Sequence, residues 1–174
     1  ELTLIGFVWS FSIPFLQFWQ VIWAIGWSMV LMAGLVFAPP IVSLIVGGAI
    51  VTASSVLSAI PPDAFGPLAL LWQILHRIPA FLPAPPDTQV FVVYPILPWF
   101  GLMALGYGMG ALFRSERRDR NLVALGLAML SLFLALRLPN LYGDPRPRSP
   151  GEDLPRTLYS FFDVTKNPPS LSFA

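Results

Sequence analysis

Long apolar runs alternate with polar, proline-rich stretches along this chain. A helix needs about 20 mainly apolar residues to cross the ~30 Å hydrocarbon core of a bilayer, and four runs approach or exceed that length. They contain no Lys, Asp or Glu, and their single Arg is Arg137, near the end of the last run. The pattern predicts an all-α, polytopic transmembrane bundle. Its four near-complete spanning helices comprise residues 19–38, 41–60, 90–113 and 122–138.

A shorter apolar stretch, residues 2–16, is interrupted by Pro14 and is interpreted either as the last half of an earlier, partial helix or as an interfacial segment. We expect residues 1–174 to form a single transmembrane domain that is a fragment truncated at both ends. Glu1 is not an initiator methionine, and no signal-peptide pattern follows it. The sequence at 168–171 resembles the entry to another apolar helix. The remaining helices of the full-length protein and the lipid bilayer are therefore expected partners.

The connections between the runs predict the topology. Pro39-Pro40 indicates a tight turn, whereas the proline-rich loops 61–89 and 139–169 are long, and the first of them is expected to hold a short interfacial helix at about 68–77. Residues 114–120 form a short connection with four arginines, and such loops stay on the cytoplasmic side. We therefore expect 114–120 and Pro39-Pro40 inside, and the two long loops outside.

Composition narrows the function classes. The chain is 56% hydrophobic and only 11% charged, which excludes an ordinary soluble domain. A formal net charge of +1 provides no field that would attract nucleic acid. There is no cysteine and His76 is the one histidine, so the sequence predicts no disulfide and no metal site.

Two features of the predicted helices point to packing. Trp19, Trp23 and Trp27 recur every four residues and so share one helix face. This face is either a ligand-stacking wall or, as we favour, an interfacial aromatic anchor with packed tryptophans below it. Gly106 and Gly110 form a GxxxG pair inside an apolar run, which is typical of close helix–helix contact rather than of a phosphate loop.

Six residues outside the arginine loop are candidates for chemistry. Tyr94 and Trp99 flank prolines near the outer end of the third predicted helix, where the break either forms the wall of a substrate pocket or serves packing alone. His76 is a weak candidate for an acid or base, because a lone histidine in a loop more often makes a structural hydrogen bond. Asp144, with Arg146 and Lys166, is either part of a substrate-binding loop or pairs locally in solvent.

Several phrases occur together in one order along nearly the whole chain, and together they resemble a known family. They are FWQVIWAIGWSM at 18–29, FGPL at 65–68 followed by Trp72 and His76, YPILPWFG at 94–101, YGDPRP at 142–147, VTK at 164–166 and PPS at 168–170. Bacterial inner-membrane proteins grouped with the catalytic domain of heparan-alpha-glucosaminide N-acetyltransferase are similar in these phrases.

The resemblance implies an integral membrane acyltransferase. It would transfer an acyl group from acyl-CoA, such as acetyl-CoA, to a saccharide acceptor such as an amino sugar at the other face of the membrane. Arg114, Arg117 and Arg118 are then candidates for binding the phosphates of the donor. The catalytic histidine of the family lies in an early motif that we expect this fragment to lack, and His76 belongs to a different part of the pattern.

Two other classes of protein remain open. A membrane transporter or exporter would also use broken helices, although its spanning segments usually carry ionisable residues, which are nearly absent here. A non-catalytic membrane scaffold would lack an acid-base pair altogether. An Asp, Arg and His motif upstream of residue 1 would distinguish the enzyme from both.

Overall fold

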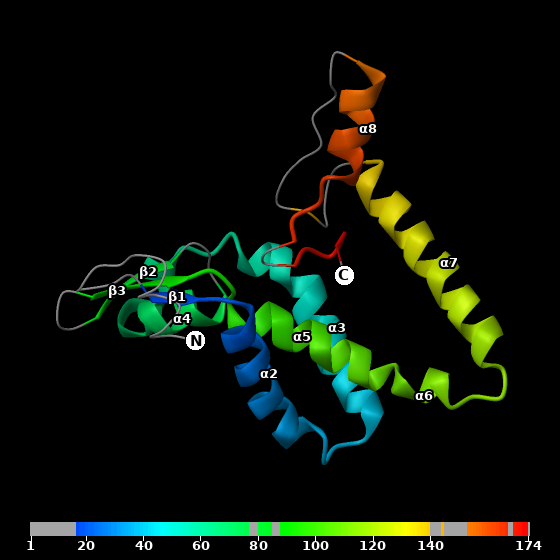
Figure 1. The fold of residues 1–174 in the computed structure, drawn as a ribbon, viewed down its shortest axis with the longest axis horizontal. Helices are drawn as coiled ribbons and strands as arrows, with labels where there is room; N and C mark the ends of the chain where they lie inside the picture. Colours follow the sequence, from blue (N-terminus) through cyan, green and yellow to red (C-terminus); the bar gives the residue numbers. More distant parts are fainter. Residues whose placement is uncertain are drawn as a thin grey trace.

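The computed structural model describes residues 17–76, 80–84, 88–139, 144, 153–166 and 169–173. Helices dominate this part of the chain (Figure 1), so the mostly helical prediction is confirmed. The expected helix within residues 2–16 lies outside the described residues. The elements are β1 Gln17–Trp19, α2 Val21–Leu35, α3 Pro40–Leu57, the 3-10 helix η1 Pro62–Leu68, α4 Ala69–Leu75, β2 Ala80–Ala84, β3 Thr88–Val92, α5 Ile96–Gly108, α6 Gly110–Phe113, α7 Arg118–Arg137 and α8 Leu154–Phe162.

Helices α3 and α5 pack closely in antiparallel orientation. A Cβ added at Gly47 would meet backbone atoms of Leu105, and one added at Gly108 would lie 2.6 Å from the backbone nitrogen of Leu44. The side chain of Ile50 fills the space over Gly101, where an added Cβ would come within 2.5 Å of it. Glycines at these positions let the two backbones approach without a side chain between them.

The predicted GxxxG contact is wrong in its residues. An added Cβ at Gly106 or Gly110 would meet no described atom within 4 Å. The α3 contact instead uses Gly101 and Gly108, two turns apart on another face of α5. Sequence spacing identified a glycine-mediated helix contact but not which face would make it.

The predicted first two helices are present in shortened form. α2 begins at Val21 and α3 ends at Leu57, and the tight turn at Pro39-Pro40 is confirmed. The two helices diverge from this turn, and both pack against α5 (Figure 1). Since α3 and α5 are antiparallel, the turn after α2 and the end of α5 lie at the same end of the helices.

A three-stranded sheet occupies the opposite end. β3 lies between β1, to which it is parallel, and β2, to which it is antiparallel. The buried side chains of this sheet are Leu82, Val90 and Val92, and Trp19 and Trp23 pack against them. The all-α prediction is therefore wrong in this region, where the fold adds a small sheet to the helices.

The third predicted helix, residues 90–113, is wrong at its start and interrupted near its end. β-branched and aromatic residues favour the strand Thr88–Val92, and Pro95 holds an extended backbone just before Ile96. The helix breaks again at Met109 before α6. Within the described residues, two segments are long and apolar enough to cross a membrane, Ile96–Phe113 and Arg118–Arg137, whereas α2 and α3 are shorter apolar helices.

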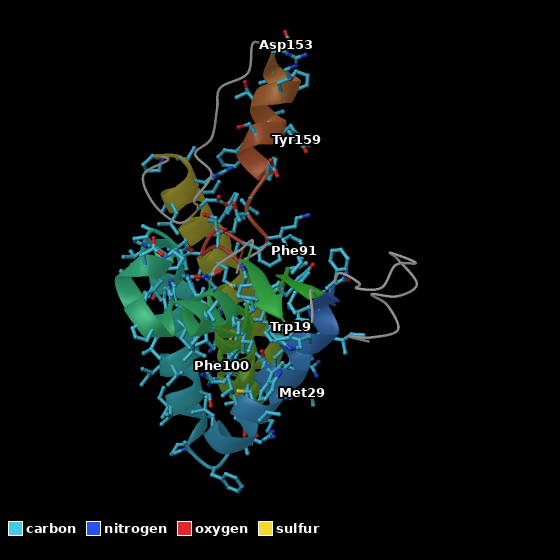
Figure 2. All side chains as sticks on the ribbon, turned by 90° about the vertical axis from the view of Figure 1, so that its left-hand side faces the viewer. Trp19, Met29, Phe91, Phe100, Asp153 and Tyr159 are labelled. Carbon is cyan, nitrogen blue, oxygen red and sulfur yellow. The ribbon has the colours of Figure 1, made fainter. Side chains whose placement is uncertain are left out.

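The two long loops contain structure as well. α4 confirms the short helix expected at about 68–77. α8, which the sequence pattern did not predict, follows α7 and projects away from the other helices, with Asp153 at its far end (Figure 2). Phe161 of α8 packs edge-on against Phe133 of α7, with ring centroids 5.5 Å apart.

We expect Gly47→Ala to destabilise the helix pair by about 1–3 kcal/mol, because the new Cβ meets backbone that cannot move without separating α3 from α5. Gly106→Ala is the matched control, since its Cβ enters open space and alanine is the better helix former. Thermal unfolding of the purified protein in detergent measures both. Equal melting temperatures for the two variants would contradict the proposed contact.

Candidate functional site

His76 is buried at the end of α4, against the last turn of α3. Its Nε2 lies 3.2 Å from the carbonyl oxygen of Ser54 and 3.2 Å from the hydroxyl oxygen of Ser58. A carbonyl oxygen only accepts hydrogen bonds, so Nε2 carries the proton and Nδ1 bears the free lone pair. Nδ1 is buried and has no hydrogen-bond partner in the described part of the chain.

Two aromatic rings form a stack that ends on this histidine. Phe65 stacks on Trp72 with centroids 4.4 Å apart, and Trp72 stacks on His76 at 5.1 Å. Burial lowers the pKa of His76 below its ordinary value, and the hydrogen bond to the Ser54 carbonyl partly opposes this shift. His76 is therefore neutral at pH 7, where it fixes α4 to α3 and presents an unprotonated Nδ1.

Tyr94 and Trp99 come together at the junction between β3 and α5. Their ring centroids are 5.5 Å apart, and both side chains are half-buried. Pro95 and Pro98 are fully buried beside them. The break in the third predicted helix therefore brings the two aromatic candidates together at the sheet end.

Asp144 is held by the C-terminal segment. One carboxylate oxygen, Oδ2, accepts hydrogen bonds from the backbone nitrogen of Thr165 at 2.7 Å and from the Ser170 hydroxyl at 3.1 Å. The other, Oδ1, accepts from the Thr165 hydroxyl at 2.7 Å. Lys166 is exposed at the adjoining turn, and Arg146 lies outside the described residues. Asp144 thus ties two parts of the last predicted loop together beside Lys166.

Arg137 organises the same region and was not among the predicted site residues. Arg137 is only 3% exposed, and its guanidinium donates hydrogen bonds to the carbonyl oxygens of Ser160, Phe161 and Asp163, at 2.8, 3.0 and 2.8 Å. These are carbonyls at the end of α8, which lack helical partners. The signal in the sequence that could have identified Arg137 is that it is the lone charged residue at the end of an apolar run.

The arginine turn, residues 114–120, is an exposed basic surface between α6 and α7. A hollow of about 400 Å³ is lined by Arg117, Arg118 and Arg120 together with Phe113, Ser115, Glu116 and Asp119. Arg114 caps α6 beside it. Arg118 pairs with Asp119 at 3.0 Å, but both side chains remain more than half exposed. Such a pair stabilises little and leaves the guanidinium groups accessible to an anion.

The tryptophan pocket, a cavity of about 540 Å³, lies where α2, α4 and α5 meet. Its lining is Trp19, Trp23, Trp27, Leu31, Leu71, Ile74, Leu75 and Ile96. Trp19 and Trp23 stack with centroids 4.7 Å apart. The expected single helix face is wrong for Trp19, which lies in strand β1, although all three rings line this cavity and Trp19 and Trp23 also pack on the sheet core.

The predicted site residues fall into separate groups. His76, Tyr94 and Trp99 lie at the sheet end, whereas the arginine turn follows the other end of α5 and α6 (Figure 1). Helical rise over Ile96–Phe113 separates the two ends by roughly 26 Å. No three His, Asp or Glu side chains cluster among the described residues in a way that would hold a metal ion.

Comparison with known proteins identifies a family. The family model described as "Heparan-alpha-glucosaminide N-acetyltransferase, catalytic" matches residues 3–138. No curated protein and no solved structure matches the chain.

Acidification should destabilise the protein partly through His76. The unfolded chain binds a proton below the ordinary pKa of 6.5, whereas the folded state resists it, so this contribution to stability is complete above pH 6.5 and is lost as the pH falls toward the folded pKa. We expect melting temperatures measured between pH 7.5 and 5 to fall more steeply for the wild type than for His76→Gln, which cannot titrate. Parallel pH profiles would show that the buried imidazole is not responsible.

Proposed function

The chain belongs to the family of the heparan-alpha-glucosaminide N-acetyltransferase catalytic domain, and from this premise we propose that it forms part of an integral membrane acyltransferase. The donor in this proposal is an acyl-CoA such as acetyl-CoA, and the acceptor is a saccharide such as an amino sugar. The family match over residues 3–138 is the observation that carries the proposal.

The arginine turn supports an acyl-CoA donor. Its four arginines oppose two acidic residues, which leaves a formal charge of +2 on residues 114–120. Guanidinium groups bind phosphates through paired, charge-assisted hydrogen bonds, and Arg117 and Arg118 line a hollow open to such a ligand. Arg114 adds positive charge at the end of α6. We assign these arginines to the phosphates of the donor.

The proposed membrane arrangement is based on the length and apolar character of the helices. α5 with α6, and α7, are the two long apolar spans, and we propose that α2 and α3 also cross the bilayer as part of the same bundle. α3 rises about 27 Å over its length, close to the ~30 Å core. Exposed apolar residues at the following turn, such as Phe37 at 91% exposure, extend the apolar surface of the shorter α2.

Orientation is proposed from charge. The turn after α2 and the arginine turn lie at the same end of the helices, and the basic connection favours the cytoplasmic side for both. The sheet, His76 and α8 are then on the outer side of a bacterial inner membrane. This arrangement puts acyl-CoA inside and leaves the outer end for the acceptor.

We assign residues at the outer end to the binding of the acceptor substrate. Tyr94 and Trp99 supply a half-buried aromatic pair against which a sugar ring packs, while Lys166, Arg146 and the hydrogen-bonded Asp144 supply polar contacts. His76 is a weak candidate for the base, since its neutral imidazole presents a free Nδ1. Its Nε2 is already hydrogen-bonded to α3, which is also what a residue that anchors α4 to α3 would do.

Changing both Arg117 and Arg118 to Ala should weaken acyl-CoA binding about tenfold or more, because charged hydrogen bonds to phosphate contribute about 1.5–3 kcal/mol each. Equilibrium binding of acetyl-CoA to the purified protein measures this change. Arg156→Ala removes an exposed arginine of α8 and serves as the control. Unchanged affinity in the double variant would exclude the arginine turn as the donor site.

A further inference from the structure

The tryptophan pocket has the chemistry of a hydrocarbon site. All eight side chains that line it are aliphatic or tryptophan, and among the described residues no carboxylate, amine, amide or hydroxyl side chain borders the cavity of about 540 Å³. Its volume lies within the range of about 300–1,000 Å³ that is usual for pockets that bind small molecules. A sugar would leave its hydroxyl groups without partners here, at about 1–3 kcal/mol for each.

The position of the pocket matches one leaflet of a bilayer. Trp19 is the last residue of strand β1 in the sheet (Figure 2), and from Trp23 to Leu31 helix α2 rises about 12 Å along the cavity wall. One leaflet contributes about 15 Å of the hydrocarbon core, and tryptophan is enriched at its polar boundary. The pocket therefore runs from the boundary to the depth that one lipid chain reaches.

The pocket is also open along its side. Trp27 and Leu71 are each 50% exposed and Leu31 is 43% exposed, so the side chains that line the cavity also form part of the apolar surface of α2 and α4. A chain from the surrounding leaflet reaches the cavity without crossing a polar barrier.

An unsatisfied donor marks the sheet end of the pocket. The indole Nε1 of Trp19 is buried and has no hydrogen-bond partner among the described residues. An indole N–H only donates, so its partner has to be an acceptor. Ester, ether and glycosidic oxygens, which join the chain of a lipid to its headgroup, are acceptors of this kind.

The acyl chain of the donor is a poor occupant. Ile96, which lines the pocket, is at the sheet end of α5, roughly 26 Å along the helices from the arginine turn assigned to the donor phosphates. A molecule anchored in the leaflet at the sheet end enters the pocket directly. For transfer at the sheet end, the pantetheine arm of a donor held at the arginine turn has to extend toward that end.

We propose that the tryptophan pocket binds one hydrocarbon chain of a lipid-anchored acceptor, which presents an amino sugar headgroup at the sheet end. This inference rests on the proposed acyltransferase function. In the transfer, the acceptor amine attacks the thioester carbonyl carbon, the C–N bond forms as the C–S bond breaks, and CoA leaves as the thiol with the proton that the amine loses.

Matched acceptors test the proposal in the protein reconstituted in lipid nanodiscs with acetyl-CoA. Hexadecyl glucosaminide, which carries a chain, is compared with free glucosamine. We expect the wild type to have the lower KM for the alkyl glucosaminide, and Trp27→Ala to raise that KM about tenfold while leaving the KM for glucosamine unchanged. Met29→Ala is the control, because Met29 is 60% exposed on α2 and does not line the pocket.

A photoreactive diazirine in the hexadecyl chain separates failure of this inference from failure of the proposed function. Labelling of residues 19–31 that excess alkyl glucosaminide prevents supports the site, even where no acyl transfer is detected. The inference is overturned if transfer occurs with equal KM for both acceptors. It is also overturned if a phospholipid of the same chain length prevents labelling equally well, or if another segment of the protein fills the pocket and no labelling occurs.

Discussion

The contact between α3 and α5 depends on three glycines, which have no side chain to separate the two backbones. The remaining elements are placed relative to this contact. With glycine at 47, 101 and 108 the two backbones meet directly, and the register of this contact is antiparallel. It sets the turn after α2 and the arginine turn at one end, and the sheet and His76 at the other. Since lipid provides no hydrophobic force between helices, close packing of this kind is what holds such a pair together.

The sheet end combines the groups that the proposed function needs at a polar boundary. Pro95 caps the start of α5, and the junction between β3 and α5 brings Tyr94 against Trp99. His76 fixes α4 to the end of α3, and α4 in turn supplies one wall of the tryptophan pocket. The pocket therefore depends on the hydrogen bond of His76 at the sheet end as well as on apolar packing.

The C-terminal part of the described chain is fixed by charged groups rather than by a core. Arg137 donates to three carbonyls at the end of α8, and Asp144 accepts three hydrogen bonds from Thr165 and Ser170. Both groups satisfy backbone or hydroxyl partners where few apolar contacts exist. Charge-assisted hydrogen bonds are stronger than neutral ones, so they hold segments that packing alone would leave loose.

The sequence by itself determined the membrane class, the helical character and the family, because apolar run length and the order of the family phrases are local properties of the chain. It also located the arginine turn. Only the tertiary structure decided that residues 88–92 form a strand, that Gly101 and Gly108 rather than Gly106 and Gly110 meet α3, and that Arg137 holds α8. Each of these outcomes depends on a partner distant in sequence, which apolar periodicity cannot identify.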